Sequence, residues 1–222
     1  MLFWDIIFNN IGTVPGWSFG GILIYLGFSE LFFAITSAFF GAATRFHALI
    51  TNGRLDVYLI RPVDPRALVF AMTFRIEYII RVLPSVLFLF AYGWALNQGL
   101  NFIGLITGII LASLAALVLA LLQLTGSYLG FWIGSMKAVE EFTQALIVLT
   151  QYPTTIMGPW LRAILTFVFP IGYAATEPAL LTVSNNSIFP SVLAMSGMLV
   201  GWLALSELTW RKGLGQYESY GG

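Results

Sequence analysis

Long apolar runs separated by short polar stretches dominate the pattern of hydrophobic and polar positions along the chain. About 20 apolar residues suffice for a helix to cross a hydrocarbon core of about 30 Å. The pattern predicts five membrane-spanning helices, over residues 19–44, 67–96, 102–135, 142–157 and 188–206. Repeated prolines divide residues 158–187 into pieces too short to span, which predicts a re-entrant helix pair. The expected fold class is therefore an all-α polytopic membrane protein.

The composition supports this fold class. Hydrophobic residues make up 59% of the 222 residues and charged residues 9%, whereas soluble domains carry about 25% charged residues. We therefore expect a single transmembrane domain over residues 1–222. The formal net charge is zero, which gives no basic field for nucleic acid, so nucleic acid is not an expected partner.

The basic residues predict how the chain is oriented in the membrane. Nine of the ten lysine and arginine residues lie in or near the stretch 45–66, the loop 136–141 and the tail 207–222. Cytoplasmic loops carry an excess of these residues. These segments are therefore expected on the cytoplasmic side and residues 158–187 on the extracellular side. With five crossings, the amino terminus would lie outside.

The charged stretch between the first two predicted crossings contains the sequence TNGRLDVYLIRPVDPR, Thr51 to Arg66. Asn52 and Gly53 predict a turn. Apolar side chains then alternate with polar ones until Pro62 ends the element. Two interpretations are open, a solvated loop that obeys the positive-inside rule or a docking element that transmits motion from a soluble partner.

Candidate chemistry within the chain is sparse. The lone histidine, His47, cannot supply a clustered metal-ligand set, so no metal site is expected. Neither lysine follows a glycine as a Walker-type nucleotide site requires. We therefore predict no catalytic residue and no enzymatic activity in this chain. If ATP drives transport, a separate polypeptide must hydrolyse it.

Glu30 is the one ionisable residue plainly in the middle of a predicted crossing. A charge inside the membrane is costly and requires a partner. Glu30 is either a hydrogen-bonded packing residue or a polar contact in a translocation path, and both interpretations stay open.

Glycines spaced four residues apart predict close helix packing. Gly126, Gly130 and Gly134 share one face of the long third segment. The same spacing recurs at Gly197 and Gly201 in the last crossing. Such faces serve either packing within the chain or an interface between subunits.

Three stretches together resemble a known family. The segment ITNGRLDVYLIRPVDPR is similar to its G-x-L-D-x-x-L-x-R-P signature. Residues Tyr152 to Leu180, YPTTIMGPWLRAILTFVFPIGYAATEPAL, are similar to its Y-P segment, and Thr209 to Gly222, TWRKGLGQYESYGG, to its W-x-x-G-x-x-x-Y-x-S-x-G ending. In this order they resemble the bacterial ABC-2 family transporter proteins, the six-crossing permease subunits of type 2 ABC exporters.

The resemblance implies a functional assembly. A permease of this family pairs with an identical or related permease and with two ABC ATP-binding subunits in the bacterial cytoplasmic membrane. ATP and Mg²⁺ are then held by those subunits, and the substrate is exported through the permease dimer. The apolar helices and the near absence of buried charge predict an amphipathic or drug-like small molecule as that substrate. The coupling helix against the ATPase is implied to contain five residues, Gly53, Arg54, Asp56, Arg61 and Pro62.

One departure from the family concerns the amino terminus. The family has a further spanning helix before the segment that starts at Phe19, and here LFWDIIFNN resembles only the end of that helix. We therefore expect that the first spanning helix is missing from this sequence.

Two alternative functions remain at this stage. The chain could be an ion-coupled secondary transporter, which would work without an ATPase subunit, or a non-transporting membrane scaffold. Association with an ATP-binding subunit separates the first interpretation from both.

Overall fold

The computed structural model describes residues 16–97, 101–133, 137–184 and 186–217. These residues form helices joined by turns and contain no strand. The elements are α2 (Phe19–Thr51), α3 (Asp56–Leu59), α4 (Pro65–Thr73), α5 (Glu77–Asn97), α6 (Phe102–Tyr128), η1 (Leu129–Phe131), α7 (Lys137–Leu149), η2 (Thr154–Ile156), α8 (Pro159–Phe167), η3 (Gly172–Thr176), α9 (Glu177–Val183) and α10 (Phe189–Leu214). The predicted all-α class is confirmed.

Within the described residues, four helices are long and apolar enough to cross a membrane: α2, α5, α6 with η1, and α10. A fifth candidate is the bent pair of Pro159–Phe167 and Gly172–Val183, which turn by 80°. The protein is a multi-pass helical membrane protein. The bent pair falls within residues 158–187, where the prolines predicted two short helices.

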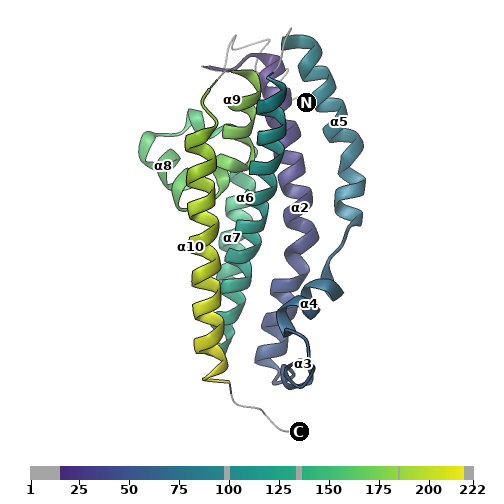
Figure 1. Ribbon diagram of the computed structural model, residues 1–222, viewed down its shortest axis with the longest axis vertical. Helices are drawn as coiled ribbons and strands as arrows, with labels where there is room; N and C mark the ends of the chain where they lie inside the picture. Colours follow the sequence, from purple (N-terminus) through teal and green to yellow (C-terminus); the bar gives the residue numbers. More distant parts are fainter. Residues whose placement is uncertain (1–15, 98–100, 134–136, 185, 218–222) are drawn as a thin grey trace.

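The long helices form one bundle (Figure 1). The described chain starts at one end with α2, reaches α3 at the other and returns along α5. It then descends along α6, rises again through α7 and the bent pair, and finally descends along α10. We call the end that contains α3 the α3 end. The last turn of α10 lies at this end as well, so the charged stretch and the start of the tail meet there.

The predicted crossing over residues 142–157 is wrong as a single helix. The helix α7 has 13 residues, or about 20 Å at ~1.5 Å per residue, which is shorter than a hydrocarbon core of about 30 Å. Pro153 prevents its continuation, because proline lacks the N–H that a helix interior needs. The turn η2, which follows α7, still lies near the start of α2, where Trp17 Nε1 donates to Thr155 Oγ1 at 2.8 Å.

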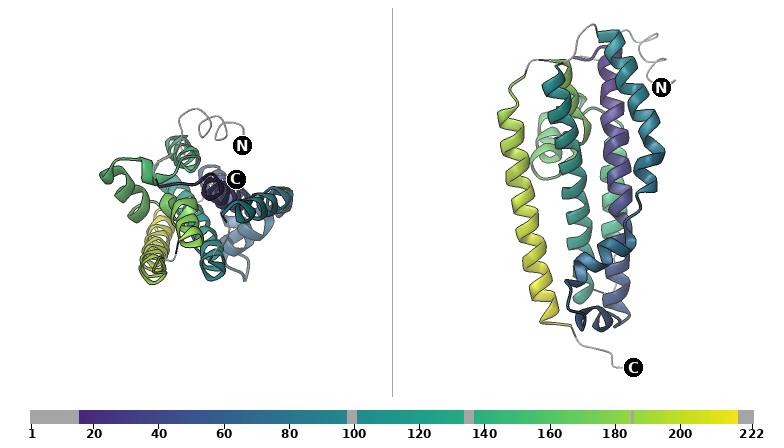
Figure 2. Two further views of the ribbon diagram at one scale, coloured as in Figure 1. Left: turned by 90° about the horizontal axis from the view of Figure 1, so that it is seen from above. Right: turned by 45° about the vertical axis from the view of Figure 1, so that its right-hand side comes forward.

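Hydroxyl groups satisfy the backbone where this crossing is broken. The Thr150 carbonyl at the end of α7 accepts from Tyr25 Oη at 2.6 Å and from Ser29 Oγ at 2.9 Å. Thr154 N donates to Thr176 Oγ1 at 3.0 Å. Irregular backbone at membrane depth is tolerated when protein groups pair with it. These bonds therefore explain how α8 and α9 fold back in the half of the bundle away from α3 (Figure 2).

Three other predicted boundaries shift. The first crossing was expected to end at residue 44, but α2 continues to Thr51 because charged side chains do not break a helix that extends into water. Residues 67–96 form two helices, α4 and α5, because Phe74 is extended and Arg75 N donates to Ala38 O of α2. The last crossing was expected to end at residue 206, but α10 continues to Leu214.

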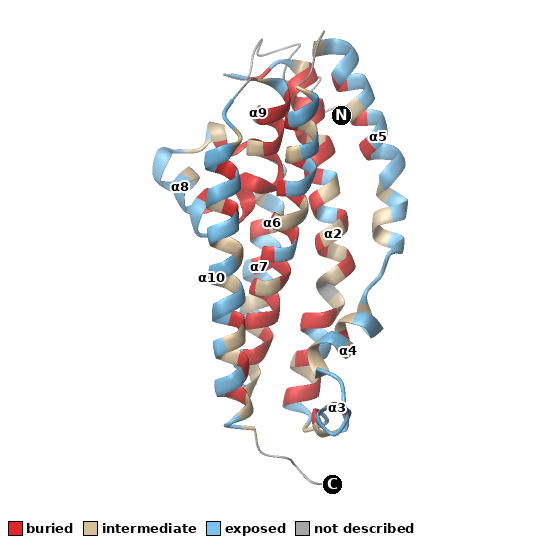
Figure 3. Ribbon diagram, in the orientation of Figure 1, coloured by how far each residue is buried: buried red, intermediate tan, exposed pale blue. Residues whose placement is uncertain are grey.

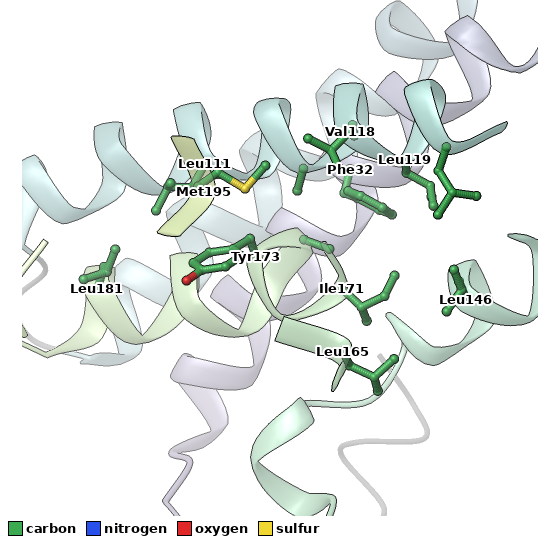
Figure 4. Packing of buried hydrophobic residues seen from close by; sticks show 14 residues of the cluster. Phe32, Leu111, Val118, Leu119, Leu146, Leu165, Ile171, Tyr173, Leu181 and Met195 are labelled. Atoms are coloured by element: carbon green, nitrogen blue, oxygen red, sulfur yellow. The ribbon is translucent and has the colours of Figure 1, made fainter. Parts of the chain in front are cut away.

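The core lies around α6, with α2 and the bent pair packed against it. Phe32, Leu119, Ile171 and Tyr173 belong to its largest buried cluster (Figure 4). Within an apolar 18-residue stretch of each spanning segment, 56% of the residues are buried in α2 and 50% in the α6 segment, against 17% in both α5 and α10. The helices α5 and α10 therefore present exposed faces outward, as the burial colouring shows (Figure 3).

Glycines allow close approach inside this core. A Cβ at Gly104 would overlap the Leu181 carbonyl of α9, and one at Gly126 would overlap Val139 of α7. A Cβ at Gly130 would lie 2.9 Å from His47 Nδ1 of α2. Both described members of the predicted trio thus pack within the chain, and Gly134 lies outside the described residues. Gly197 and Gly201 meet nothing within 4 Å.

Candidate coupling surface at the α3 end

Gly53 ends α2 through its backbone conformation. Its φ is +64°, a left-handed value that favours glycine. Gly53 N donates to Ile50 O at 3.2 Å and Arg54 N to Leu49 O at 2.9 Å. This pair of bonds is a Schellman motif, which satisfies the last carbonyls of a helix. Gly53 therefore fixes the direction in which the chain enters α3.

The single turn α3 has one side against the protein and one side facing outward. Leu55 is fully buried and Tyr58 is 9% exposed, which holds the turn against the end of α2. Val57 is 53%, Ile60 83% and Val63 54% exposed. The segment from Val57 to Val63 thus displays apolar side chains at the most polar end of the molecule. We call Val57, Ile60 and Val63 the α3 tip.

The predicted coupling residues all lie on this loop. Arg54, Arg61 and Pro62 are exposed. The Arg61 guanidinium lies 5.7 Å from the centre of the Tyr58 ring, which orients it beside the tip. Asp56 is the first residue of α3, where a carboxylate interacts favourably with the helix N-terminus. The structure therefore brings the sequence-predicted residues together on one surface.

A chain of ion pairs that the sequence did not suggest connects this loop to α10. Arg66 Nη2 lies 2.8 Å from Asp64 Oδ2, and Arg66 Nη1 pairs with Glu207 Oε2. Glu207 Oε1 in turn accepts from Arg211 Nε at 2.6 Å. Hydrogen bonding to Arg66 lowers the pKa of Asp64, and the same bond raises the pKa of Arg66. The four charges therefore join the start of α4 to the last turns of α10.

An aromatic cluster lies beneath these ion pairs. The Trp210 ring lies 5.7 Å from the ring centre of Phe46, 5.0 Å from that of Tyr128 and 5.9 Å from that of Phe131. The Arg66 guanidinium lies 5.5 Å from the centre of the Trp210 ring. Arg66 thus combines charge pairing with a cation–π contact, a combination for which arginine is better suited than lysine. The cluster holds the ends of α2, α6 and α10 together.

The tail contributes two further contacts. Leu55 N donates to Tyr217 Oη at 3.2 Å, and burial together with the nearby charge of Asp56 raises the pKa of the Tyr217 hydroxyl. Gly213 lies against the Phe131 ring, with no room for a Cβ. Trp210, Gly213 and Tyr217 are the described members of the W-x-x-G-x-x-x-Y ending. Trp210 and Tyr217 hold the tail against the loop through Arg66 and Leu55, whereas Gly213 packs against η1.

Glu30 lies away from this surface, on the side of α2 that faces α5. It borders an open cavity of about 460 Å³ with Leu26, Pro84 and Phe88. Its side chain is exposed and has no hydrogen bond or ion pair with any described residue. No described residue therefore supplies the polar partner that a charge at membrane depth requires.

Metal chemistry finds no support in the described segments. They contain no group of three or more histidine, cysteine, aspartate or glutamate side chains that could hold an ion. His47 lies between α2 and Gly130, and its Nδ1 is buried without a hydrogen-bond partner among the described residues.

A comparison with protein families agrees with the motifs. The model of the family described as ABC-2 family transporter protein matches residues 1–221. No curated protein and no solved structure matches the chain. The match includes the loop that contains α3, the bent helix pair and the tail whose contacts are described above. The chain belongs to the ABC-2 family of transporter proteins.

Proposed function

We propose that this permease is the membrane subunit of an ATP-driven exporter in the bacterial cytoplasmic membrane. ABC ATP-binding subunits, which hold ATP and Mg²⁺, dock at the α3 end, and a second identical or related permease completes the translocation path. The observation that carries the proposal is the α3 tip. Ile60 is 83% exposed at a charge-rich end of the protein, and exposed apolar groups rimmed by polar residues are typical of protein interaction sites.

The contacts around the tip suggest how force would travel. Leu55 and Tyr58 connect α3 to the end of α2, while Arg66 and Glu207 connect the start of α4 to α10. Closure of the ATP-binding subunits on ATP would push on the tip and shift both long helices together. The permease would then alternate between inward-open and outward-open states, with nucleotide biasing the equilibrium.

The substrate is an amphipathic or drug-like small molecule. Its path would run beside Glu30, whose exposed carboxylate on α2 faces the cavity toward α5. The second permease copy would cover this side, because a carboxylate at membrane depth needs a polar partner. Glu30→Gln should then change transport while docking of the ATP-binding subunit is kept.

Co-purification tests the proposal. The permease should retain an ATP-binding subunit when it is expressed with its neighbouring genes and purified in a mild detergent. Ile60→Glu should reduce the retained amount at least about tenfold, because burying a charge in an apolar interface costs more than about 1.4 kcal/mol. Gln216→Glu, at an exposed position of the same end, is the matched control. No retention by the wild-type protein would favour an ion-coupled carrier or a scaffold.

A further inference from the structure

A cavity lies where α2, α4 and α5 meet. Its volume is about 570 Å³, and it opens to the surface of the protein. Its polar lining comes from six side chains, those of Ser37, Thr44, Arg45, Thr73, Arg75 and Tyr78. The break between α4 and α5 creates it, because Arg75 N donates to Ala38 O at 3.2 Å and so draws the chain back toward α2.

Two arginines give the cavity a positive charge that the described residues do not neutralise. No described carboxylate pairs with Arg45 or Arg75 within 4.0 Å. The guanidinium of Arg45 makes one long contact, from Nη2 to Tyr58 Oη at 3.4 Å. Two guanidinium groups beside hydroxyl donors form a typical set of ligands for a phosphate group.

The distance of the cavity from the start of α2 is close to the thickness of a hydrocarbon core. Ala38, which accepts from Arg75 N, lies roughly 28 Å along α2 from Phe19 at ~1.5 Å per residue. A hydrocarbon core is about 30 Å thick. If the aromatic residues Trp17 and Phe19 mark one surface, the cavity lies at the headgroup level of the other, on the side of α3.

Exposed apolar side chains lie on the elements that form the cavity. Met72 is 63%, Ile76 51% and Ile80 62% exposed, and all three lie on or beside the elements that line it. A ligand with a charged head and apolar chains could thus place its head in the cavity and its chains along α4 and α5. Basic pockets between helices on the cytoplasmic side bind anionic headgroups in this way.

We infer that this cavity binds the phosphate group of an anionic membrane lipid from the leaflet on the α3 side. Arg45 and Arg75 pair with the phosphate, and Thr44 and Tyr78 donate hydrogen bonds to it. Because Arg45 also contacts Tyr58, the bound headgroup lies one side chain away from α3. The inference concerns lipid binding alone, so its test does not depend on whether the protein exports a substrate.

Lipid binding to the purified full chain tests the inference. Dioleoylphosphatidylglycerol is titrated onto the protein in a neutral detergent, and bound lipid is counted by native mass spectrometry. The double variant R45Q/R75Q should bind about tenfold more weakly or worse, since each arginine near a membrane surface contributes about 1 kcal/mol. The charge-conserving R45K/R75K should keep most of the affinity, and K212Q, an exposed cation of the same end, should keep all of it.

A second variant separates a loss of lipid binding from misfolding, and competing ligands identify what the cavity binds. A48W fills the cavity from α2 and leaves both arginines in place, so it should also weaken binding. Dioleoylphosphatidylcholine and inorganic phosphate are the competing ligands. Arginine-dependent binding of inorganic phosphate that displaces the lipid would identify a soluble phosphate as the source and still support an anion site. Equal lipid binding by wild type, R45Q/R75Q and A48W would overturn the inference.

Discussion

Arg66 connects segments that lie 141 positions apart in the sequence. Its guanidinium pairs with Asp64 and Glu207 and covers the Trp210 ring. Because Asp64 also caps α4 by accepting from Arg66 N at 2.8 Å, one carboxylate serves both the start of the helix and the ion-pair chain. These few side chains attach the loop between α3 and α4 to α10.

The low pKa of Asp64 predicts how stability changes with pH. A carboxylate whose folded pKa lies below its ordinary value of 3.8 stabilises the fold above that value and loses this effect as the pH falls through the folded pKa. Asp64→Asn should therefore lower the Tm of the detergent-purified protein at pH 7. The difference from wild type should shrink as the pH falls below 4. Glu141→Gln, from a more exposed pair with Lys137, should change Tm little at any pH, and an equal effect of both variants would contradict the role of Asp64.

Gly53 allows a test of the entry into α3. Gly53→Ala places a Cβ at φ +64°, which costs about 1–2 kcal/mol. A lower Tm in thermal unfolding is expected. Gly215→Ala, where φ is −69°, should cost less, and a Gly53→Ala protein as stable as wild type would show that the loop adopts another conformation.

At the scale of elements, the sequence predicted the apolar helices well and their ends poorly. The apolar runs of α2, α5, α6 and α10 are long enough to identify each helix, because hydropathy reports burial in lipid directly. The charge at Arg45 predicts a loop, whereas α2 continues past it to Thr51 as the helix leaves the membrane. The division of α4 from α5 depends on a bond from Arg75 to Ala38, a tertiary contact that no local pattern encodes.

The candidate site was predicted only in part, for the same reason. Gly53, Asp56, Arg61 and Pro62 are neighbours in sequence, and a family motif marks them. Glu207 and Trp210 reach the loop only after α10 folds against α6. The motif at the end of the chain was the available signal, but sequence alone did not say which residues it contacts.

The contact between α6 and α9 can be tested at Gly104. A Cβ there overlaps the Leu181 carbonyl, which is backbone and cannot turn aside. Gly104→Ala should therefore destabilise the protein by about 1–3 kcal/mol, seen as a lower Tm. Gly201→Ala is the control, because a Cβ at this position of α10 would meet nothing within 4 Å. Equal Tm values for the two variants would mean that the helices are not packed at this distance.

At the scale of the whole molecule, basic residues from distant segments gather at one end. Arg54 and Arg61 of the loop and Arg211 and Lys212 of α10 belong to this end, because α3 and the last turn of α10 both lie there (Figure 1). The positive-inside rule therefore predicts that this end faces the cytoplasm. The charged loop is then available to a soluble partner, which the proposed docking needs.

The orientation predicts which positions react with reagents outside the cell. The chain has no cysteine, so a single introduced cysteine is a clean probe. Ile60→Cys should resist a membrane-impermeant maleimide in intact cells and react after lysis. Asn186→Cys, exposed in the turn before α10, should react in intact cells. The reverse pattern would invert the topology and rule out docking at the α3 tip.

The proposed function requires that the α3 tip contacts an ATP-binding subunit. A photo-crosslinking residue at position 60, in cells that express the permease with its neighbouring genes, measures this contact. We expect a crosslinked product that contains the ATP-binding subunit from position 60 and none from position 186. If position 60 gives no such product while the ATP-binding subunit co-purifies with the permease, the docking site lies elsewhere and docking at the α3 tip is contradicted.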